Sequence, residues 1–270
     1  MKLLTFNMCV EVGSVAERLE ALGELVRDKR PEYIALQGVT NDTLKTIKTS
    51  GWAARYPHIT QPPTRFETRT KATVAILSTY PAVKSITINY HDSPGKKKAV
   101  VGFFSMYDKQ KVEHYICVVS TMLDPGLDLS LIREQEINEL MYELRDHDDC
   151  FLLADMGLIA GVDGSLELSG GWKDAWLACG KSPKDGHTVD PDSNSLIKSG
   201  QRDRPDRILY RTQRYQLDST EVVGTAKFKG TFISPHFGVL SVFSPLDTIL
   251  PDHPVTDLPC SFLRPRNSLH

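Results

Sequence analysis

The feature that most constrains the fold is a series of short apolar segments of strand length, separated by polar turns or by helical segments. They lie at residues 3–8, 33–37, 72–77, 83–89, 99–107, 114–120, 150–154, 207–211, 216–223 and 239–243. Runs of this length and composition are typical of strands. Between them, residues 14–26 and 131–144 repeat apolar residues at helical spacing. This order predicts an α/β fold in which two sheets pack as a sandwich and helices lie outside.

Composition limits the partners and the compartment. The chain carries 32 basic and 34 acidic residues, a formal net charge of −2, which gives no global attraction for a phosphate backbone. The five cysteines are odd in number and include no CxxC pair: Cys9, Cys117, Cys150, Cys179 and Cys260. This spacing fits neither a disulfide framework nor a zinc site. No apolar run approaches the roughly 20 residues that span a bilayer, so we expect a cytoplasmic or nuclear protein without membrane contact.

Proline marks a change near the C-terminus. Five prolines lie within the last 26 residues: Pro245, Pro251, Pro254, Pro259 and Pro265. Because proline interrupts helices and central strands, we predict one domain over residues 1–244 and a Pro-rich tail over 245–270.

Four segments match, in order, the signature blocks of a known enzyme superfamily. They are Leu4-Thr5-Phe6-Asn7-Met8, Ala35-Leu36-Gln37-Gly38-Val39, Leu153-Ala154-Asp155-Met156-Gly157 and Ser234-Pro235-His236-Phe237-Gly238. Each block is a weak signal by itself, but their order and spacing make the set specific. The chain therefore resembles the exonuclease-endonuclease-phosphatase superfamily, whose fold is the DNase I-like sandwich.

Three further segments narrow the resemblance to the tyrosyl-DNA phosphodiesterase 2 branch of that superfamily. Residues 173–176 look like its Asp-Ala-Trp element, residues 204–211 look like its Arg-Phe-Asp-Arg-Ile block, and residues 187–190 fall where it carries Tyr-Thr-Trp-Asp. The resemblance implies Mg²⁺-dependent hydrolysis of a phosphodiester. It also implies catalytic positions at Asn7, Asp155, Asp206 and His236, which this chain retains.

Four other positions depart from the family pattern. Gly38 stands where the family has its metal-binding Glu, and Met122 stands where a His contacts the phosphate. Gly157 replaces the Asn that binds phosphate or water, and Pro235 replaces the Asp to which we assign the orientation of His236. Because losses of single catalytic residues commonly cost orders of magnitude in rate, we expect no family-type turnover and no bound cofactor. The retained positions are then expected to be structural remnants, and the His236 imidazole to lack an orienting carboxylate.

Three functions are compatible with this pattern. The first, which we favour, is a catalytically inactive pseudo-phosphodiesterase that serves as a protein-binding or scaffold module. The second is a non-catalytic nucleic-acid binder that uses Trp172, Trp176, Arg204 and Arg207 for stacking and phosphate contacts. The third is a working metal-dependent phosphodiesterase whose rebuilt site holds Mg²⁺ with Asp155, Asp206 and His236, helped by Asp190 or Asp42.

Overall fold

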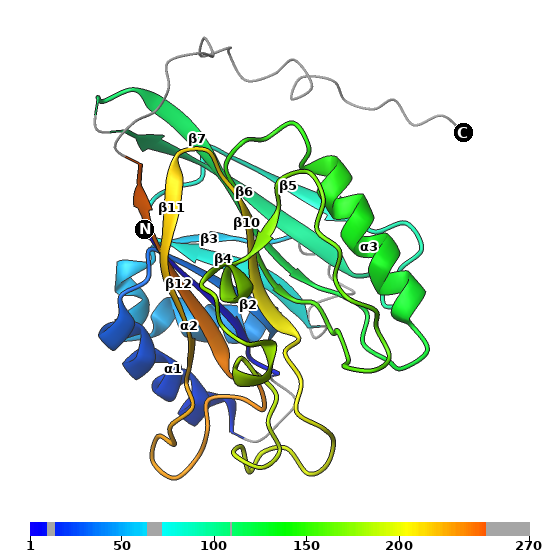
Figure 1. Ribbon diagram of the computed structural model, residues 1–270. Coiled ribbons are helices and arrows are strands. Elements are labelled where there is room, and N and C mark those ends of the chain that lie inside the picture. The colour runs from blue at the N-terminus through cyan, green and yellow to red at the C-terminus, as the bar shows by residue number, and fades with distance from the viewer. Residues whose placement is uncertain (10–13, 64–71, 109, 247–270) are drawn as a thin grey trace.

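Two six-stranded mixed sheets form the framework of the protein (Figure 1). The structure is a computed structural model that describes residues 1–9, 14–63, 72–108 and 110–246. The first sheet has the order β11-β12-β1-β2-β4-β3 and the second has the order β5-β6-β7-β8-β10-β9. The strands are β1 (Lys2–Asn7), β2 (Tyr33–Val39), β3 (His58–Thr60), β4 (Thr73–Ser78), β5 (Lys84–Asn89), β6 (Lys98–Tyr107), β7 (Glu113–Met122), β8 (Cys150–Asp155), β9 (Lys173–Asp174), β10 (Asp206–Arg211), β11 (Tyr215–Val223) and β12 (Gly238–Pro245).

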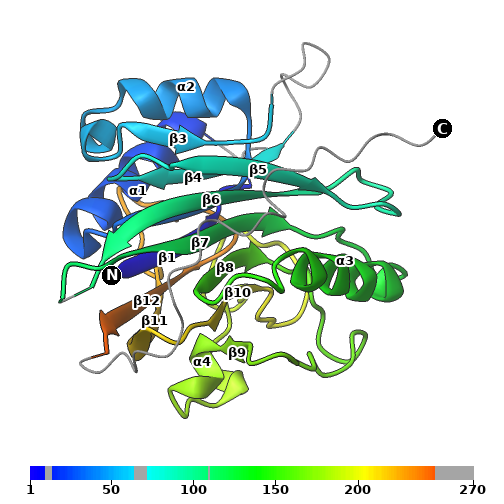
Figure 2. The same cartoon turned by 90° about the horizontal axis from the view of Figure 1, so that it is seen from above.

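The outer faces of the two sheets are covered by α1 (Val15–Lys29), α2 (Asn41–Thr49) and α3 (Ser130–Glu143). The short α4 (Ala175–Ala178) packs against β10 and β11, and 3-10 helices lie at Gly51–Arg55 and Pro183–Asp185. Figure 2 shows α1 and α2 on one side of the sandwich and α3 on the other. Leu22 and Leu44 pack on the outer face of the first sheet, whereas Ile137 and Leu140 pack on that of the second. Each sheet therefore buries both of its faces.

The central core lies between the sheets. Leu3 and Ile76 from the first sheet pack with Val118 and Phe151 from the second. One polar bridge crosses this core, because the Gln37 amide nitrogen donates to Ser120 Oγ and to the Leu153 carbonyl, both at 3.2 Å. Buried amides are stable when their hydrogen bonds are made, so this bridge fixes the register of the sheets.

Strand direction gathers the signature blocks at one edge. β1 and β2 are parallel, as are β7 and β8, so their carboxyl ends share an edge. β12 is antiparallel to β1 and β10 is antiparallel to β8, which brings the amino ends of β12 and β10 to the same edge. The residues that end β1 and β8 thus meet those that begin β10 and precede β12.

The predicted two-sheet sandwich with outer helices is confirmed. All ten predicted strands and both helices are present, with ends displaced by a few residues at most. α2 and β3 were not predicted. The domain boundary at residue 244 falls inside β12, which continues to Pro245, where Tyr215 is the paired residue. Most of the predicted Pro-rich tail, residues 247–270, lies outside the described part.

Among the helices of the described residues, none combines the length and the apolar composition needed to cross a bilayer.

Candidate functional site

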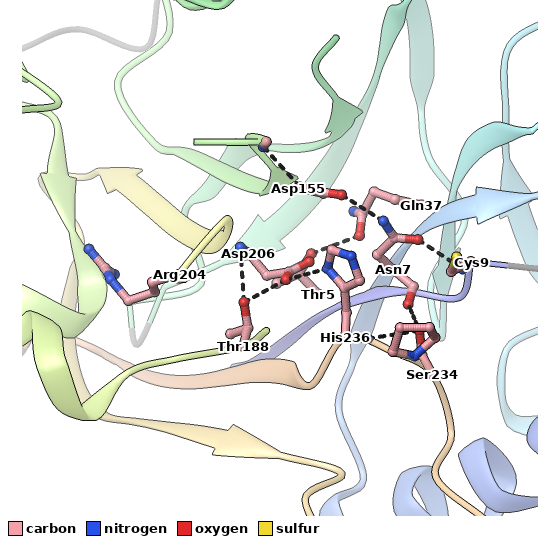
Figure 3. Close-up of polar contacts among 12 residues, drawn as sticks. Thr5, Asn7, Cys9, Gln37, Asp155, Thr188, Arg204, Asp206, Ser234 and His236 are labelled. Atoms are coloured by element: carbon pink, nitrogen blue, oxygen red, sulfur yellow. Dashed lines mark hydrogen bonds and ion pairs between the residues drawn. The ribbon is translucent and has the colours of Figure 1, made fainter. Parts of the chain in front are cut away.

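His236 and Asp206 form an ion pair at the centre of the gathered edge (Figure 3). His236 Nδ1 lies 2.8 Å from Asp206 Oδ2, and the Asp206 side chain is fully buried. Thr188 Oγ1 donates to the same carboxylate oxygen at 2.6 Å. The imidazole therefore has an orienting carboxylate, and our expectation of an unpartnered His236 is wrong. β10 supplies that carboxylate by starting at Asp206, and Pro235 leaves the orientation of the imidazole intact.

Asn7 and Asp155 form a second pair, which joins the two sheets (Figure 3). Asn7 ends β1 and Asp155 ends β8, and the Asn7 Nδ2 atom donates to Asp155 Oδ2 at 2.6 Å. The other Asp155 oxygen accepts the Gly157 amide at 2.9 Å. Both oxygens of this buried carboxylate thus accept hydrogen bonds from the protein, as buried charged groups require.

A buried arginine fixes the loops on both sides of this site. Arg18 of α1 donates to the carbonyl oxygens of Met8 at 2.5 Å, Cys9 at 3.1 Å and Ile233 at 3.1 Å. Ser234 Oγ then donates to the Asn7 carbonyl at 2.6 Å. The segment before His236 is therefore held directly against the end of β1.

Gly38 has a backbone conformation that excludes the family's carboxylate. Its φ is +62°, in the left-handed region that side chains rarely adopt. A Cβ atom here would lie 2.5 Å from Asn7 Oδ1 and 3.0 Å from the Cys9 amide nitrogen. The pairing of β2 with β4 also shifts register between Leu36 and Val39. The metal-binding position is thus closed by the backbone as well as by the loss of the side chain.

Met122 and Gly157 complete the departures from the family pattern. The Met122 side chain packs against the central core, and its sulfur lies 3.9 Å from Asn7 Nδ2. A thioether carries neither a charge nor a proton to offer a phosphate. Gly157 contributes its amide to Asp155 and has a φ of +57°. Neither position supplies a side-chain group that binds an oxyanion.

The imidazole of His236, paired with Asp206, has a raised pKa. Burial of the imidazole lowers its pKa, but the charge and hydrogen bond of Asp206, with the charge of Asp155, outweigh burial and raise the pKa of His236 to about 9. Burial raises the pKa of the Asp206 carboxyl. His236 is therefore protonated at neutral pH, where a general base must be unprotonated to accept a proton.

The residues present do not fit the Mg²⁺ that the family resemblance implies. Candidate ligand atoms of Asp155, Asp206 and His236 do lie within 4.8 Å of one another. However, both Asp155 oxygens already accept hydrogen bonds. Of the ligand atoms of these three residues, only Asp206 Oδ1 is buried without a hydrogen-bond partner among the described residues. Mg²⁺ prefers oxygen ligands in octahedral geometry, and a protonated imidazole repels a cation.

Asp42 and Asp190 lie away from this cluster. Asp42 lies on α2, is 66% exposed and pairs with Lys45. Asp190 accepts hydrogen bonds from Asp192 and Ser193 in its own turn and from Arg202. Neither carboxylate contributes to a rebuilt site in this structure.

The candidate nucleic-acid contacts are engaged inside the protein. Trp172 is 5% exposed and Trp176 is 7% exposed, so neither ring presents a stacking surface. Arg204 makes two hydrogen bonds to Asp174, at 3.0 and 2.7 Å, and Arg207 approaches the same carboxylate at 3.5 Å. The interpretation of these four residues as a nucleic-acid surface is therefore wrong for the two tryptophans and lacks support for the arginines.

Sequence reasoning assigned no role to Thr188 or Arg18. Thr188 lies in a segment that carried the family resemblance, but its hydrogen bond to Asp206 joins residues 18 positions apart in the sequence, which no local pattern reveals. Arg18 gave no signal, because an arginine within an amphipathic helix is normally exposed. Its burial depends on the loops that it binds.

Comparison of the sequence with known protein families identifies the family of this chain. The chain matches the Endonuclease/Exonuclease/phosphatase family over residues 4–261. No curated protein sequence matches it.

Solved structures share the fold at low sequence identity. TDP2 of D. rerio, solved with a single-strand DNA product, has a TM-score of 0.77 and 17% identity, covering 90% of this chain and 98% of that one. Truncated TDP2 of Caenorhabditis elegans has a TM-score of 0.76 and 19% identity, covering 90% and 96%. The catalytic domain of human Nocturnin, with a bound sulfate anion, has a TM-score of 0.69 and 16% identity, covering 91% and 94%.

The predicted resemblance to TDP2 is thus confirmed for the fold, which is all that identities this low can show. With the family match extending over nearly the whole sequence and the two-sheet sandwich beneath it, the chain belongs to the Endonuclease/Exonuclease/phosphatase family.

Proposed function

We propose that this protein is a non-hydrolysing member of its family, a pseudo-phosphodiesterase that acts by binding a protein partner in the cytoplasm or nucleus. The observation that carries the proposal is the conformation of Gly38. Its φ of +62° and the 2.5 Å approach of Asn7 Oδ1 to a Cβ position leave no room for the carboxylate that would hold the metal. Without a metal, a phosphodiester loses the charge stabilisation on which its hydrolysis depends.

The retained polar residues have structural roles that account for their presence. Asn7 and Asp155 connect the ends of β1 and β8, and Asp206 and His236 connect β10 to the segment before β12. Removing one partner would leave a buried charge or donor unpaired. Breaking a buried ion pair in this way lowers the free energy of unfolding by several kcal/mol, on the order of 3–5 kcal/mol. Selection for stability alone is a sufficient reason to keep them.

A protein partner is supported by exposed apolar side chains at one end of the second sheet. Tyr107 is 66% exposed, Val83 54%, Val112 46% and Tyr115 37%. Tyr107 and Tyr115 lie on adjacent strands of the β6–β7 hairpin, because Tyr107 pairs with Glu113 and Ser105 pairs with Tyr115. Val112 directly precedes β7, and Val83 lies beside Phe103 further along β6, since its amide donates to the Phe103 carbonyl. Clustered exposed apolar residues commonly mark protein contacts. The net charge of −2 and the buried tryptophans favour protein over nucleic acid.

Hydrolysis assays test the proposal. Purified wild-type protein and its His236→Ala variant would be incubated with a 5′-phosphotyrosyl oligonucleotide and with bis(p-nitrophenyl) phosphate, in Mg²⁺ and in Mn²⁺. We expect both proteins to give the rate of buffer alone. Metal-dependent turnover by the wild type that the His236→Ala variant lacks would overturn the proposal.

That outcome would support the second candidate, a rebuilt phosphodiesterase. One observation favours it, the grouping of Asp155, Asp206 and His236 ligand atoms within 4.8 Å, where Asp206 Oδ1 has no described hydrogen-bond partner. In that case Asp155→Asn would also abolish turnover. Equal rates in the wild type and the Asp155→Asn variant would reject it.

A further inference from the structure

The second sheet ends at β5, whose outer edge is open. β5 is the first strand in the order of that sheet, and its one neighbour among the described strands is β6. Its six residues pair with β6 in one unbroken register, from Lys84 opposite Phe103 to Asn89 opposite Lys98. An edge strand of this length presents a row of unpaired N–H and C=O groups to solvent. A further strand can therefore pair with β5.

The outward main-chain groups of β5 belong to Ser85, Thr87 and Asn89. In the register that β5 shares with β6, the Tyr90 amide donates to the Lys97 carbonyl at 3.4 Å, so these two residues form a hydrogen-bonded pair. Hydrogen-bonded and non-hydrogen-bonded pairs alternate along antiparallel strands, so every second residue before Tyr90 also bonds to β6. The three residues between them direct their N–H and C=O groups away from β6. Among the described residues, none donates to or accepts from these outward groups.

The other edges of the two sheets, as far as the chain is described, are short or covered. β3 has three residues and β9 has two. β11 is longer, but its pairing with β12 shifts register between Leu217 and Ser219. Lys181 Nζ also donates to the Thr220 carbonyl of β11 at 2.6 Å. Shortness, bulges and lysines are usual means by which proteins prevent edge-to-edge pairing. β5 has only Lys84, at its first position.

The sequence of β5 is complementary to itself in the antiparallel direction. Two copies can bond only in registers that place outward-facing residues opposite one another, because those residues carry the free main-chain groups. The register centred on Thr87 meets this condition at all three positions, since Thr87 faces its own copy and Ser85 faces Asn89. The same register places Ile86 opposite Ile88. Pairs of threonines and pairs of β-branched apolar residues stabilise antiparallel strands.

Charge does not oppose this pairing. Lys84 is the one charged residue of β5, and in the register centred on Thr87 it lies opposite Tyr90 of the second copy rather than opposite another lysine. The formal net charge of −2 makes general repulsion between two copies weak. The match at every outward position is a property of this sequence, so it favours a second copy over an unrelated strand.

We propose that two copies of this chain pair through β5, antiparallel and in the register centred on Thr87. The pairing joins two six-stranded sheets edge to edge about a two-fold axis. β5 runs in the same direction as β7, because both are antiparallel to β6. Since β7 and β8 end together at Met122 and Asp155, the two copies place their Asp206–His236 pairs at opposite ends of the joined sheet. The inference does not depend on whether the protein hydrolyses phosphodiesters.

Sedimentation equilibrium of the full-length protein, from low micromolar to hundreds of micromolar concentration, measures the association. We expect the weight-average mass to rise from the chain mass of 30.2 kDa toward twice that value. Thr87→Lys places two ammonium groups opposite one another at the two-fold axis, so the dissociation constant should rise about tenfold or more. Ser219→Lys, at an exposed position of the other long edge strand, β11, is the matched control and should associate like the wild type. Urea unfolding at low concentration checks that the two variants are equally stable.

Hydrogen exchange locates the interface in the wild-type protein. The amides of Ser85, Thr87 and Asn89 should exchange more slowly as the protein concentration rises, because each then donates to the second copy. Thr87→Pro removes an outward N–H that β6 does not use, so it should keep the fold and abolish the association. A monomer at every concentration, unchanged association of Thr87→Lys, or self-association without slower exchange at these three amides would overturn the inference.

Discussion

The side-chain oxygen of Asn7 lies 2.5 Å from the position that a Cβ atom on Gly38 would occupy. Asn7 is held there because its oxygen accepts the Cys9 amide at 2.9 Å and its nitrogen donates to Asp155. A side chain at Gly38 must therefore displace a group that connects the two sheets. Gly38 has therefore lost more than a carboxylate, because Asn7 and the backbone now occupy the space that a side chain at this position would need.

Gly38→Ala should lower the free energy of unfolding by about 2 kcal/mol or more, because it adds left-handed strain and a steric collision. Gly164→Ala is the matched control, since a Cβ there meets no atom within 4 Å, and it should change stability by less than about 0.5 kcal/mol. Urea unfolding measures both. Gly38→Glu should likewise destabilise the protein without conferring Mg²⁺-dependent hydrolysis. Equal stability of the two alanine variants would contradict this account of Gly38.

The Asp206–His236 pair should make stability depend on pH in the alkaline range. Because the folded pKa of His236, about 9, lies above its ordinary value of 6.5, the folded state binds the proton more tightly. The stabilisation is complete below about pH 6.5 and is lost as the pH rises through about 9, amounting to about 3 kcal/mol at most. The measurement is the difference in unfolding free energy between the wild type and His236→Gln, which should shrink over this range. A constant difference would contradict the ion pair.

Glu136 should also make stability fall as the pH rises, but at lower pH and because its charged form is disfavoured in the folded state. This residue of α3 is 2% exposed, and burial raises the pKa of its carboxyl to about 7. A raised pKa means that ionisation is resisted in the folded state, so stability should fall as the pH rises from about 4.5 to about 7. Glu136→Gln should remove this slope, whereas Glu134→Gln, at an exposed position of the same helix, should keep it. Unfolding curves across that range distinguish the two results.

Arg18 should be the most costly single side chain to remove from the site's support. Its three hydrogen bonds satisfy the carbonyl oxygens of Met8, Cys9 and Ile233 inside the protein. Arg18→Met leaves these acceptors without their donor, so we expect a loss of about 3 kcal/mol. Arg27→Met, at an exposed position of α1, should change stability by less than about 0.5 kcal/mol. Comparable midpoints of thermal unfolding for the two variants would contradict the buried role of Arg18.

The sequence predicted the sheets because apolar strand runs carry their own local signal. It did not predict α2, whose nine residues include only two large apolar side chains, Leu44 and Ile47, among threonines and lysines. β3, with three residues, is too short to show a pattern. These elements form because they cover the outer face and edge of the first sheet, which is a property of the assembled fold.

The site was predicted as a set of residues but not as a set of contacts. Asn7, Asp155, Asp206 and His236 do gather at one edge, and the resemblance to the family supplied that set. The pairing of Asp206 with His236 depends on β10 running antiparallel to β8, which no local pattern reveals. The φ of Gly38 and the burial of the tryptophans are likewise set by tertiary packing, so sequence reasoning left the state of these positions open.

The central claim is that this site does not hold the divalent ion of its family. The direct measurement is isothermal titration calorimetry of Mn²⁺ into the wild-type protein at neutral pH, with Asp155→Asn as the matched variant. The account predicts no saturable heat at millimolar Mn²⁺ and identical traces for the two proteins. Stoichiometric Mn²⁺ binding by the wild type that the Asp155→Asn variant lacks would contradict it.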